Sequence, residues 1–374
     1  MHTQSEFKQL QNMATTIVDE SCGHAEISQA LDAFAALCSS ITHIEPSPTF
    51  IANSGDTELD QGVAINPEAA AQCVKDYPRS IQFIRGTFSA ITRKLANKDV
   101  RVELLYAGCG PYATLLLPLL TLLPLDRLNI TLLDIHPESL ESVQQLVRYF
   151  GLIRFNLYYV CDDACQYQHD TPIDIAIAEV MQKALEQEPQ VMVTANLASQ
   201  MKPDGFFVPE RVQIELWLAD GDHEQQQIRG LEPIAFKDLQ LIRNRQFIGS
   251  VFELNISTIN TLLFERGVVE NGKTSQILFE NIQLPKRAPT TSTLMSLSDV
   301  ILVTRIQTFG DYWLNDYESD LSLPVRLPQL IDTCENRQLA VRYQLGRYPI
   351  FEFQIIDEDN PGGDGAFCRE RANQ

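Results

Sequence analysis

A pair of glycines and three aspartates are spaced as in a binding site for a nucleoside. Gly108 and Gly110 lie in ELLYAGCGPYATL, residues 103–115, where a strand should end and a helix begin, so the backbone can approach a ligand closely. Asp134 is expected at the end of the next strand, where a carboxylate can accept both hydroxyls of a ribose. Asp162 and Asp163 follow the third strand, in position to bind an adenine amino group. Three successive strand ends thus supply groups for one ligand.

The glycine loop alone leaves alternatives open. It could be a tight strand-to-helix turn without a ligand. Ala113 occupies the third position of a dinucleotide fingerprint that tolerates alanine, so NAD also fits the loop. The acidic pair after the third strand and an upstream arginine, Arg79, favour S-adenosyl-L-methionine instead. No cluster of His, Cys and Asp has the spacing of a metal site, so we expect no metal.

The elements that must position these residues alternate between strand and helix from residue 100 onward. This order predicts an α/β fold, with a Rossmann-like parallel sheet and helices on both of its faces. The expected strands are 102–106, 130–134, 157–160 and 173–177, and the expected helices are 115–123 and 137–150.

After Pro209 the pattern changes to an alternation of apolar and polar residues. Val212, Ile214 and Leu216 alternate with polar residues, and segments 252–256, 276–284, 300–306, 339–344 and 350–356 also resemble strands. A period of two without intervening helices predicts an antiparallel, barrel-like β domain.

The N-terminal region has its own helical pattern. Ile27, Leu31 and Phe34 have helical spacing, and residues 46–64 resemble a linker or surface loop. Another helix should begin at Pro67, and Pro78 should kink or split it. We therefore expect an N-terminal helical extension, residues 1–60, and a Rossmann-like domain that binds S-adenosylmethionine, residues 61–210. A β-barrel-like domain for substrate binding and dimerisation, residues 211–374, would follow.

The composition is that of a soluble globular protein. The 374 residues are 44% hydrophobic, and the formal net charge of −20 repels phosphate backbones, so we expect no nucleic-acid partner. We find no secretory signal, and the apolar run 115–125 is too short to span a membrane. Eight cysteines without a CxxC pair indicate free thiols in a reducing compartment, so we expect a cytoplasmic protein.

Several segments resemble class I S-adenosylmethionine-dependent methyltransferases, and within that class the protein arginine methyltransferases. KDYPRSIQF (75–83) is similar to the family's D-x-x-R-T segment, YAGCGPY to its glycine loop, LLDIHPESL to its ribose segment and CDDA to its adenine segment. The resemblance covers about residues 65–210 and implies that Arg79 binds the methionine carboxylate. It implies S-adenosyl-L-methionine as cofactor, S-adenosyl-L-homocysteine as product, and these cofactor-binding residues: Arg79, Ala107, Gly108, Gly110, Asp134, Asp162, Asp163 and Glu179.

The segment IAEVMQKALEQE, residues 177–188, is similar to the family's double-glutamate loop. Its two glutamates lie nine positions apart, as do Glu179 and Glu188, and Glu186 is the alternative second member. A guanidinium is a poor nucleophile, but two carboxylates can hold its N–H groups and concentrate electron density on the attacking nitrogen. The resemblance thus implies that Glu179 and Glu188 are catalytic. The alternative is that Glu179 caps a loop and that Glu186 and Glu188 form a solvated acidic face.

The chain departs from the family at several positions. Tyr106 replaces an acidic residue, Ala178 a serine and Gln182 a glycine, and we find no YFxxY segment and no Thr-His-Trp loop. We therefore expect an N-methyltransferase for a guanidino or amino group of a small, arginine-like molecule. The alternatives are a protein arginine N-methyltransferase and a non-catalytic binding subunit with a methyltransferase fold. The family dimerises through an arm, so we expect a homodimer, with residues 220–249 as a candidate insertion.

Overall fold

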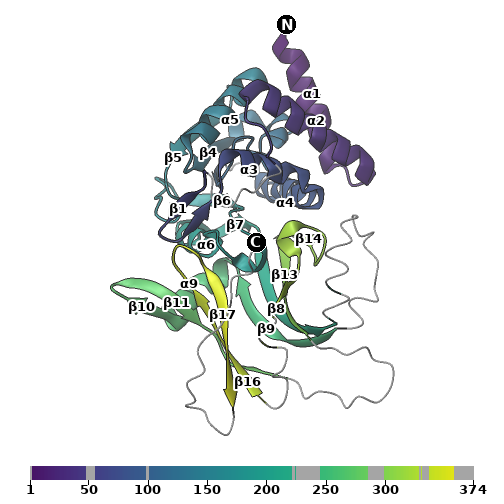
Figure 1. Cartoon of the computed structure of the whole chain (residues 1–374). Coiled ribbons are helices and arrows are strands. Elements are labelled where there is room, and N and C mark those ends of the chain that lie inside the picture. The colour runs from purple at the N-terminus through teal and green to yellow at the C-terminus, as the bar shows by residue number, and fades with distance from the viewer. Residues whose placement is uncertain are drawn as a thin grey trace.

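A computed structural model describes residues 2–47, 55–97, 101–220, 224, 245–284, 299–327, 330 and 337–357. Helices and a parallel sheet form one half of the molecule, at the top of Figure 1, and antiparallel strands form the other half. The change of pattern after Pro209 therefore corresponds to a real change of architecture. The domain boundaries near residues 60 and 210 stay predictions.

The parallel sheet has the strand order β5-β4-β3-β6-β7, and every neighbouring pair is parallel. The predicted parallel sheet is therefore confirmed. Because the chain runs outward from β3 to β5 and then returns to the other side of β3, the strand order reverses beside the glycine loop, where open α/β sheets bind ligands. The strands are β3 (Val102–Ala107), β4 (Leu128–Asp134), β5 (Asn156–Cys161), β6 (Ile173–Ala178) and β7 (Met201–Val208).

Alternate residues of the central strands pack into two apolar clusters, as the pleat of a strand requires. Leu104 belongs to the cluster that includes side chains of α4 and α5, and Leu105 belongs to the cluster that includes side chains of α6. All six residues of β6 are buried. The helices are α1 (His2–Val18), α2 (His24–Thr42), α3 (Pro67–Gln72), α4 (Tyr77–Leu95), α5 (Pro137–Tyr149) and α6 (Gln190–Ala198).

The helix expected from Pro67 is split, as predicted. α3 continues into the 3-10 helix η1 (Cys73–Lys75), and α4 begins at Tyr77 after Asp76. Pro78 lies in the first turn of α4, where a missing backbone N–H leaves no helical hydrogen bond unmade. This break directs the first turn of α4, which contains Arg79, toward the carboxyl edge of the sheet.

Three expectations were wrong. Residues 115–123 form turns and a short 3-10 helix, η2 (Pro118–Thr121), because Pro118 and Pro124 prevent a continuous helix although the segment is almost entirely buried. The expected linker 46–64 contains a hairpin of β1 (Thr57–Leu59) and β2 (Gly62–Ala64). Ile256 begins helix α9 (Ile256–Arg266) rather than continuing a strand, because Asn255 caps that helix. Short 3-10 helices also occur at Leu125–Arg127, Lys183–Leu185 and Asp320–Ser322.

The second half is antiparallel, as predicted, but its described residues form two separate sheets rather than one continuous barrel. An aromatic cluster of Phe252, Phe279, Tyr343 and Phe351 joins the two sheets. One sheet contains β8 (Arg211–Ala219), β9 (Gln246–Leu254), β13 (Asp299–Phe309), β14 (Tyr312–Leu314) and β15 (Val325–Arg326). The other contains β10 (Gly267–Glu270), β11 (Lys273–Leu278), β12 (Ile282–Gln283), β16 (Arg337–Gln344) and β17 (Ile350–Asp357).

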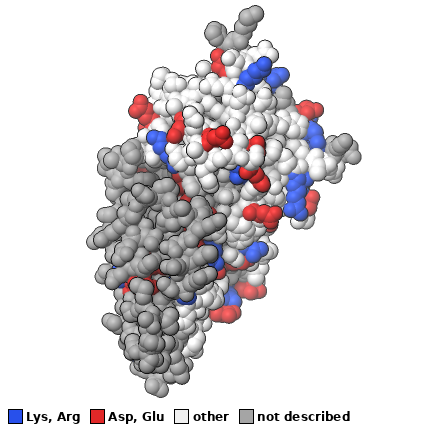
Figure 2. Space-filling model, turned by 90° about the vertical axis from the view of Figure 1, so that its right-hand side faces the viewer, with Lys and Arg blue, Asp and Glu red and all other residues white. Residues whose placement is uncertain are grey.

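Most of the candidate insertion at 220–249 lies outside the described residues. On the face drawn in Figure 2, basic and acidic side chains of the described residues are interspersed singly or in small groups. Across the part of the chain that the structure describes, we find no helix with the length and apolar character needed to cross a lipid bilayer.

Candidate functional site

The glycine loop after β3 has the backbone conformation that the sequence suggested. Gly108 and Gly110 have φ angles of +66° and +62°, in the left-handed region that favours glycine. A Cβ atom on Gly108 would lie 2.2 Å from Cγ1 of Val180, so a side chain does not fit there. The N–H of Gly108 donates to the carbonyl of Leu133 at 2.9 Å. The loop is therefore fixed against the end of β4.

Asp134 ends β4 and orders the loops around it. Its Oδ2 accepts a hydrogen bond from the N–H of Gly110 at 2.8 Å, and its Oδ1 accepts one from the N–H of His136 at 2.9 Å. The residue is only 7% exposed. Because each carboxylate oxygen has two lone pairs, Asp134 can still accept hydrogen bonds from ligand hydroxyls.

The two aspartates after β5 shape the next loop. Oδ1 of Asp162 accepts from the N–H of Asp163 at 2.8 Å, and Oδ1 of Asp163 accepts from the N–H of Cys165 at 2.9 Å. Asp162 is exposed and Asp163 is half-buried. Both therefore help to fold the loop while remaining accessible to a ligand.

One cavity collects nearly all of the residues that the sequence suggested. Ala107 is not among the lining residues: it is fully buried in the apolar cluster that includes α6 side chains. Glu186 also lies outside the lining, whereas Glu188 belongs to it. The suggested residues that line the cavity are Arg79, Gly108, Gly110, Asp134, Asp162, Asp163, Glu179 and Glu188.

Glu179, directly after β6, forms an ion pair with Arg79 from the first turn of α4. Its other oxygen, Oε1, is buried and accepts no hydrogen bond from the described part of the chain. Burial raises the pKa of Glu179, although Arg79 acts in the opposite direction. The site therefore contains a buried carboxylate oxygen that is available to a hydrogen-bond donor of a ligand.

Glu188 lies on the same cavity and is 7% exposed. Burial, and next the charge of Glu179, raise the pKa of Glu188 to about 8, against the opposing effect of Arg79. Arg79 thus faces two carboxyl groups, and Glu188 is the one whose raised pKa favours the protonated form at neutral pH.

The loop between the two glutamates has a strained backbone. Ala184, Leu185 and Gln187 are not glycines, yet their φ angles are 55°, 55° and 64°. Such residues cost about 1–3 kcal/mol each and persist only where the surroundings hold them. Strain of this kind is concentrated at functional sites more often than elsewhere.

Side chains from both halves of the molecule hold this loop. The amide of Gln190 donates to the carbonyl of Ala178 and accepts from the N–H of Val180, each at 2.9 Å. From the antiparallel half, Thr304 accepts from the N–H of Ala184 at 2.9 Å, and the hydroxyl of Tyr343 donates to the carbonyl of Leu185. No local pattern in the sequence marks these partners.

The β1–β2 hairpin is a part of the site that the sequence pattern did not predict. Leu59, Val63 and Ala64 line the cavity, and the N–H of Val63 donates to the carbonyl of Gln187 at 2.8 Å. A Cβ atom on Gly62 would lie 2.6 Å from the nitrogen of Pro189, so the hairpin packs directly on the strained loop.

The hairpin is also attached to the antiparallel half. Glu58 forms an ion pair with Arg347 at 2.7 Å and accepts a hydrogen bond from Tyr348. The two strands of the hairpin have three residues each, too few to show an alternation of apolar and polar residues in the sequence. This explains why the segment resembled a linker.

Similarity to known proteins is found among solved structures. No family model and no curated protein matches the chain. Among solved structures, it is similar to a Trypanosoma brucei PRMT1 enzyme–prozyme heterotetrameric complex with AdoHcy. The TM-score is 0.46 and the identity 12%, over 79% of this chain and 95% of that one. It is also similar to Arabidopsis thaliana Protein Arginine Methyltransferase 10 in a uniquely open conformation, with a TM-score of 0.45 and 9% identity, over 80% and 95% of the two chains. At these identities the similarity does not bear on activity.

Proposed function

We propose that the protein is an S-adenosyl-L-methionine-dependent N-methyltransferase that acts on a guanidino or amino group of a small, arginine-like molecule. One observation supports this above the others. The Arg79–Glu179 pair and Glu188 line the same cavity as the glycine loop and Asp134. A structural ion pair alone would not need to face a ligand-sized cavity.

The residues on the cofactor side suit this ligand. Asp134 has free lone pairs for ribose hydroxyls, and Gly108 allows close approach of the backbone. Asp163 would bind the adenine amino group, with Asp162 beside it, and Arg79 would bind the methionine carboxylate through its remaining N–H donors. When bound, S-adenosyl-L-methionine supplies an electrophilic methyl group on a sulfonium.

The two glutamates would hold the methyl acceptor. A guanidinium offers N–H donors to the free Oε1 of Glu179, and its positive charge would lower the pKa of Glu188 until that carboxyl releases its proton. Two ionised carboxylates would then orient the acceptor nitrogen while its bond to the methyl carbon forms and the carbon–sulfur bond breaks. The proton that the nitrogen loses would pass to one of these carboxylates and from there to water. In this proposal Glu188, and not Glu186, is the second member of the clamp, because only Glu188 lines the cavity.

The hairpin supports a small acceptor. It contributes three apolar side chains to the cavity wall and is fastened to the second half through Glu58. Because the hairpin forms part of the cavity wall, we propose that the cavity suits a small acceptor better than a polypeptide. A protein arginine N-methyltransferase is the alternative, and activity on free L-arginine against an Arg/Gly-rich peptide distinguishes the two.

The central test is Glu179→Gln, with Glu186→Gln as the matched control. We expect methyl transfer to the best acceptor to fall by about 10² to 10⁴, since a carboxylate that orients the acceptor and compensates its charge is lost, while Glu186→Gln remains close to wild type. A Glu179→Gln variant with near wild-type turnover would exclude the clamp. Binding of S-adenosyl-L-methionine without any turnover would instead indicate a non-catalytic binding subunit.

We also propose that the protein forms a homodimer in the cytoplasm, as the resemblance and the cysteine pattern suggest. Light scattering tests the dimer: a mass near 42.2 kDa, that of one chain, would exclude it.

A further inference from the structure

We propose that Ser319 is a positioning residue: it holds Asp76, and through Asp76 it sets the place of Arg79 at the cavity. This inference rests on the proposed role of Arg79 as the anchor of the cofactor carboxylate. It concerns a residue of the antiparallel half that does not line the cavity.

Asp76 connects the two residues with its two carboxylate oxygens. As the N-cap of α4, it accepts a hydrogen bond through Oδ1 from the N–H of Arg79 at 3.3 Å. Its Oδ2 accepts from the hydroxyl of Ser319 at 2.7 Å and from the N–H of Asp320 at 3.0 Å. The helix turn that presents Arg79 is therefore fixed from outside the parallel half.

The charge of Asp76 depends on this contact. Burial raises the pKa of Asp76, and the hydrogen bond from Ser319 is the largest opposing effect, ahead of the charge of Arg79. The charge of Asp320 acts in the same direction as burial, and Asp76 in turn raises the pKa of Glu179. Loss of the Ser319 hydroxyl would therefore favour the neutral form of Asp76 and remove a negative charge beside the anchor.

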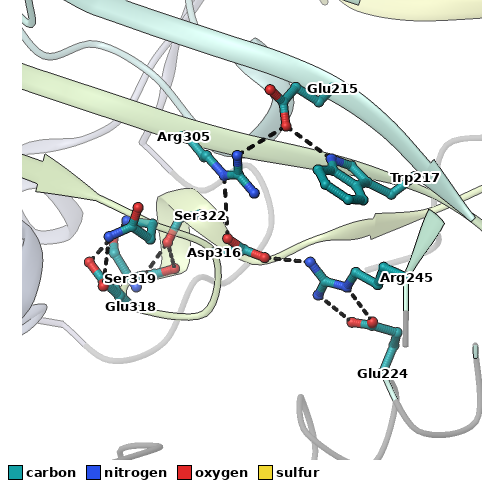
Figure 3. Close-up of polar contacts among 10 residues, drawn as sticks. Glu215, Trp217, Glu224, Arg245, Arg305, Asp316, Glu318, Ser319 and Ser322 are labelled. Carbon is teal, nitrogen blue, oxygen red and sulfur yellow. Dashed lines mark hydrogen bonds and ion pairs between the residues drawn. The ribbon is translucent and has the colours of Figure 1, made fainter. Parts of the chain in front are cut away.

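The loop that carries Ser319 is itself held by a buried ionic network, which Figure 3 shows. Asp316 forms ion pairs with Arg245 and, at 3.6 Å, with Arg305. Arg245, whose side chain is 2% exposed, also binds both oxygens of Glu224 at 2.7 and 2.8 Å. Removing one partner from a buried pair costs far more than removing an exposed one, so this network fixes the loop firmly.

The turn around Ser319 is also closed from within. The hydroxyl of Ser322 accepts from the N–H of Ser319 at 3.1 Å, and the hydroxyl of Ser319 accepts from the N–H of Leu321 at 3.1 Å. The Ser319 hydroxyl thus accepts from Leu321 within its own turn and donates to Oδ2 of Asp76 outside it.

The experiment measures the affinity for S-adenosyl-L-homocysteine by calorimetry between about pH 4.5 and 8. In Ser319→Ala we expect roughly tenfold weaker binding, with the loss at acid pH beginning at a higher pH than in wild type. Ser319→Thr keeps the hydroxyl and should restore both the wild-type affinity and the wild-type pH profile. Asp320→Asn removes a negative charge that raises the pKa of Asp76. In this variant the loss of binding at acid pH should therefore begin at a lower pH. Ser199→Ala, an exposed serine of the parallel half, is the control.

The outcomes separate this inference from the proposed function. If Arg79→Ala binds S-adenosyl-L-homocysteine as tightly as wild type, the anchor itself is wrong. If Arg79→Ala weakens binding but Ser319→Ala leaves the pH profile unmoved, the positioning role is overturned, whatever happens to thermal stability. If Ser319→Ala does not fold, Asp320→Asn replaces it as the test. A pH profile of Asp320→Asn that matches wild type would also overturn the positioning role of Ser319.

Discussion

Replacing Glu188 by glutamine should change how the stability of the protein depends on pH. Burial and the charge of Glu179 raise the pKa of Glu188 from 4.5 to about 8 in the folded protein, while the unfolded chain keeps the ordinary value. Because the folded pKa is the higher of the two, the stabilising effect is complete below pH 4.5 and is lost as the pH rises through about 8. Glutamine has the same shape and does not titrate, so Glu188→Gln should not show this loss.

The size of the effect follows from the same two values. Each pH unit between them changes the free energy of unfolding by about 1.4 kcal/mol, so the span from 4.5 to about 8 corresponds to about 5 kcal/mol. The side chain of Glu188 is only 7% exposed, so solvent screening reduces this figure little. Relative to wild type, Glu188→Gln should gain roughly 3 kcal/mol between about pH 5.5 and about pH 7.5.

Urea denaturation of wild type, Glu188→Gln and Glu186→Gln at a series of pH values measures this difference. The comparison cancels every other group that titrates in the same way in all three proteins. Glu186→Gln removes a carboxyl group from the same loop but outside the cavity lining, so it serves as the matched control. If the Glu188→Gln curve is parallel to wild type, Glu188 is not a buried protonated carboxyl, and the electrostatic account of the clamp is wrong.

The glycine loop, the anchor and the clamp each give one more prediction. Gly108→Ala should destabilise the protein by about 1–3 kcal/mol, visible as a lower melting temperature, because its φ is +66° and the new methyl would meet Val180 at 2.2 Å; an unchanged melting temperature contradicts this. Arg79→Lys keeps the charge but loses the forked donors, so the Kd for S-adenosyl-L-homocysteine should rise about tenfold, and calorimetry would reveal an equal Kd if the anchor is elsewhere. The kcat/KM for a guanidino acceptor should rise with pH up to about 8, since Glu188 must lose its proton to hold a cation; initial rates that are flat over this range would refute it.

The sequence predicted the parts of the site that follow from local rules. Parallel strands present their carboxyl ends at one edge, so the groups after β3, β4 and β5 had to meet. The hydrogen bond between Gly110 and Asp134, 24 positions apart, is a result of that rule. The split at Pro78 was equally predictable, because proline is tolerated in the first helical turn and disfavoured further on.

Contacts between distant segments could not be predicted in this way. Arg79 and Glu179 are 100 positions apart, and Asp76 and Ser319 are 243 apart. The resemblance marks Arg79 and Glu179 as site residues, but no local pattern pairs them with each other. No local pattern marks Ser319 at all, so only the packing of the two halves brings it to Asp76. The same is true of the hairpin, which meets Gln187 through Val63 and Arg347 through Glu58, both far away in the sequence.

The antiparallel half therefore also stabilises the loop that carries the two glutamates. A loop with three strained residues and two buried carboxyl groups is unfavourable by itself, and it would relax if its neighbours were removed. Many of the groups that prevent this come from the second half: Thr304 and Tyr343 bind the strained loop, the carbonyl of Pro349 accepts from the N–H of Gln187 at 2.9 Å, and Ser319 holds Asp76. Three of these contacts hold Ala184, Leu185 and Gln187, the strained residues that directly precede Glu188.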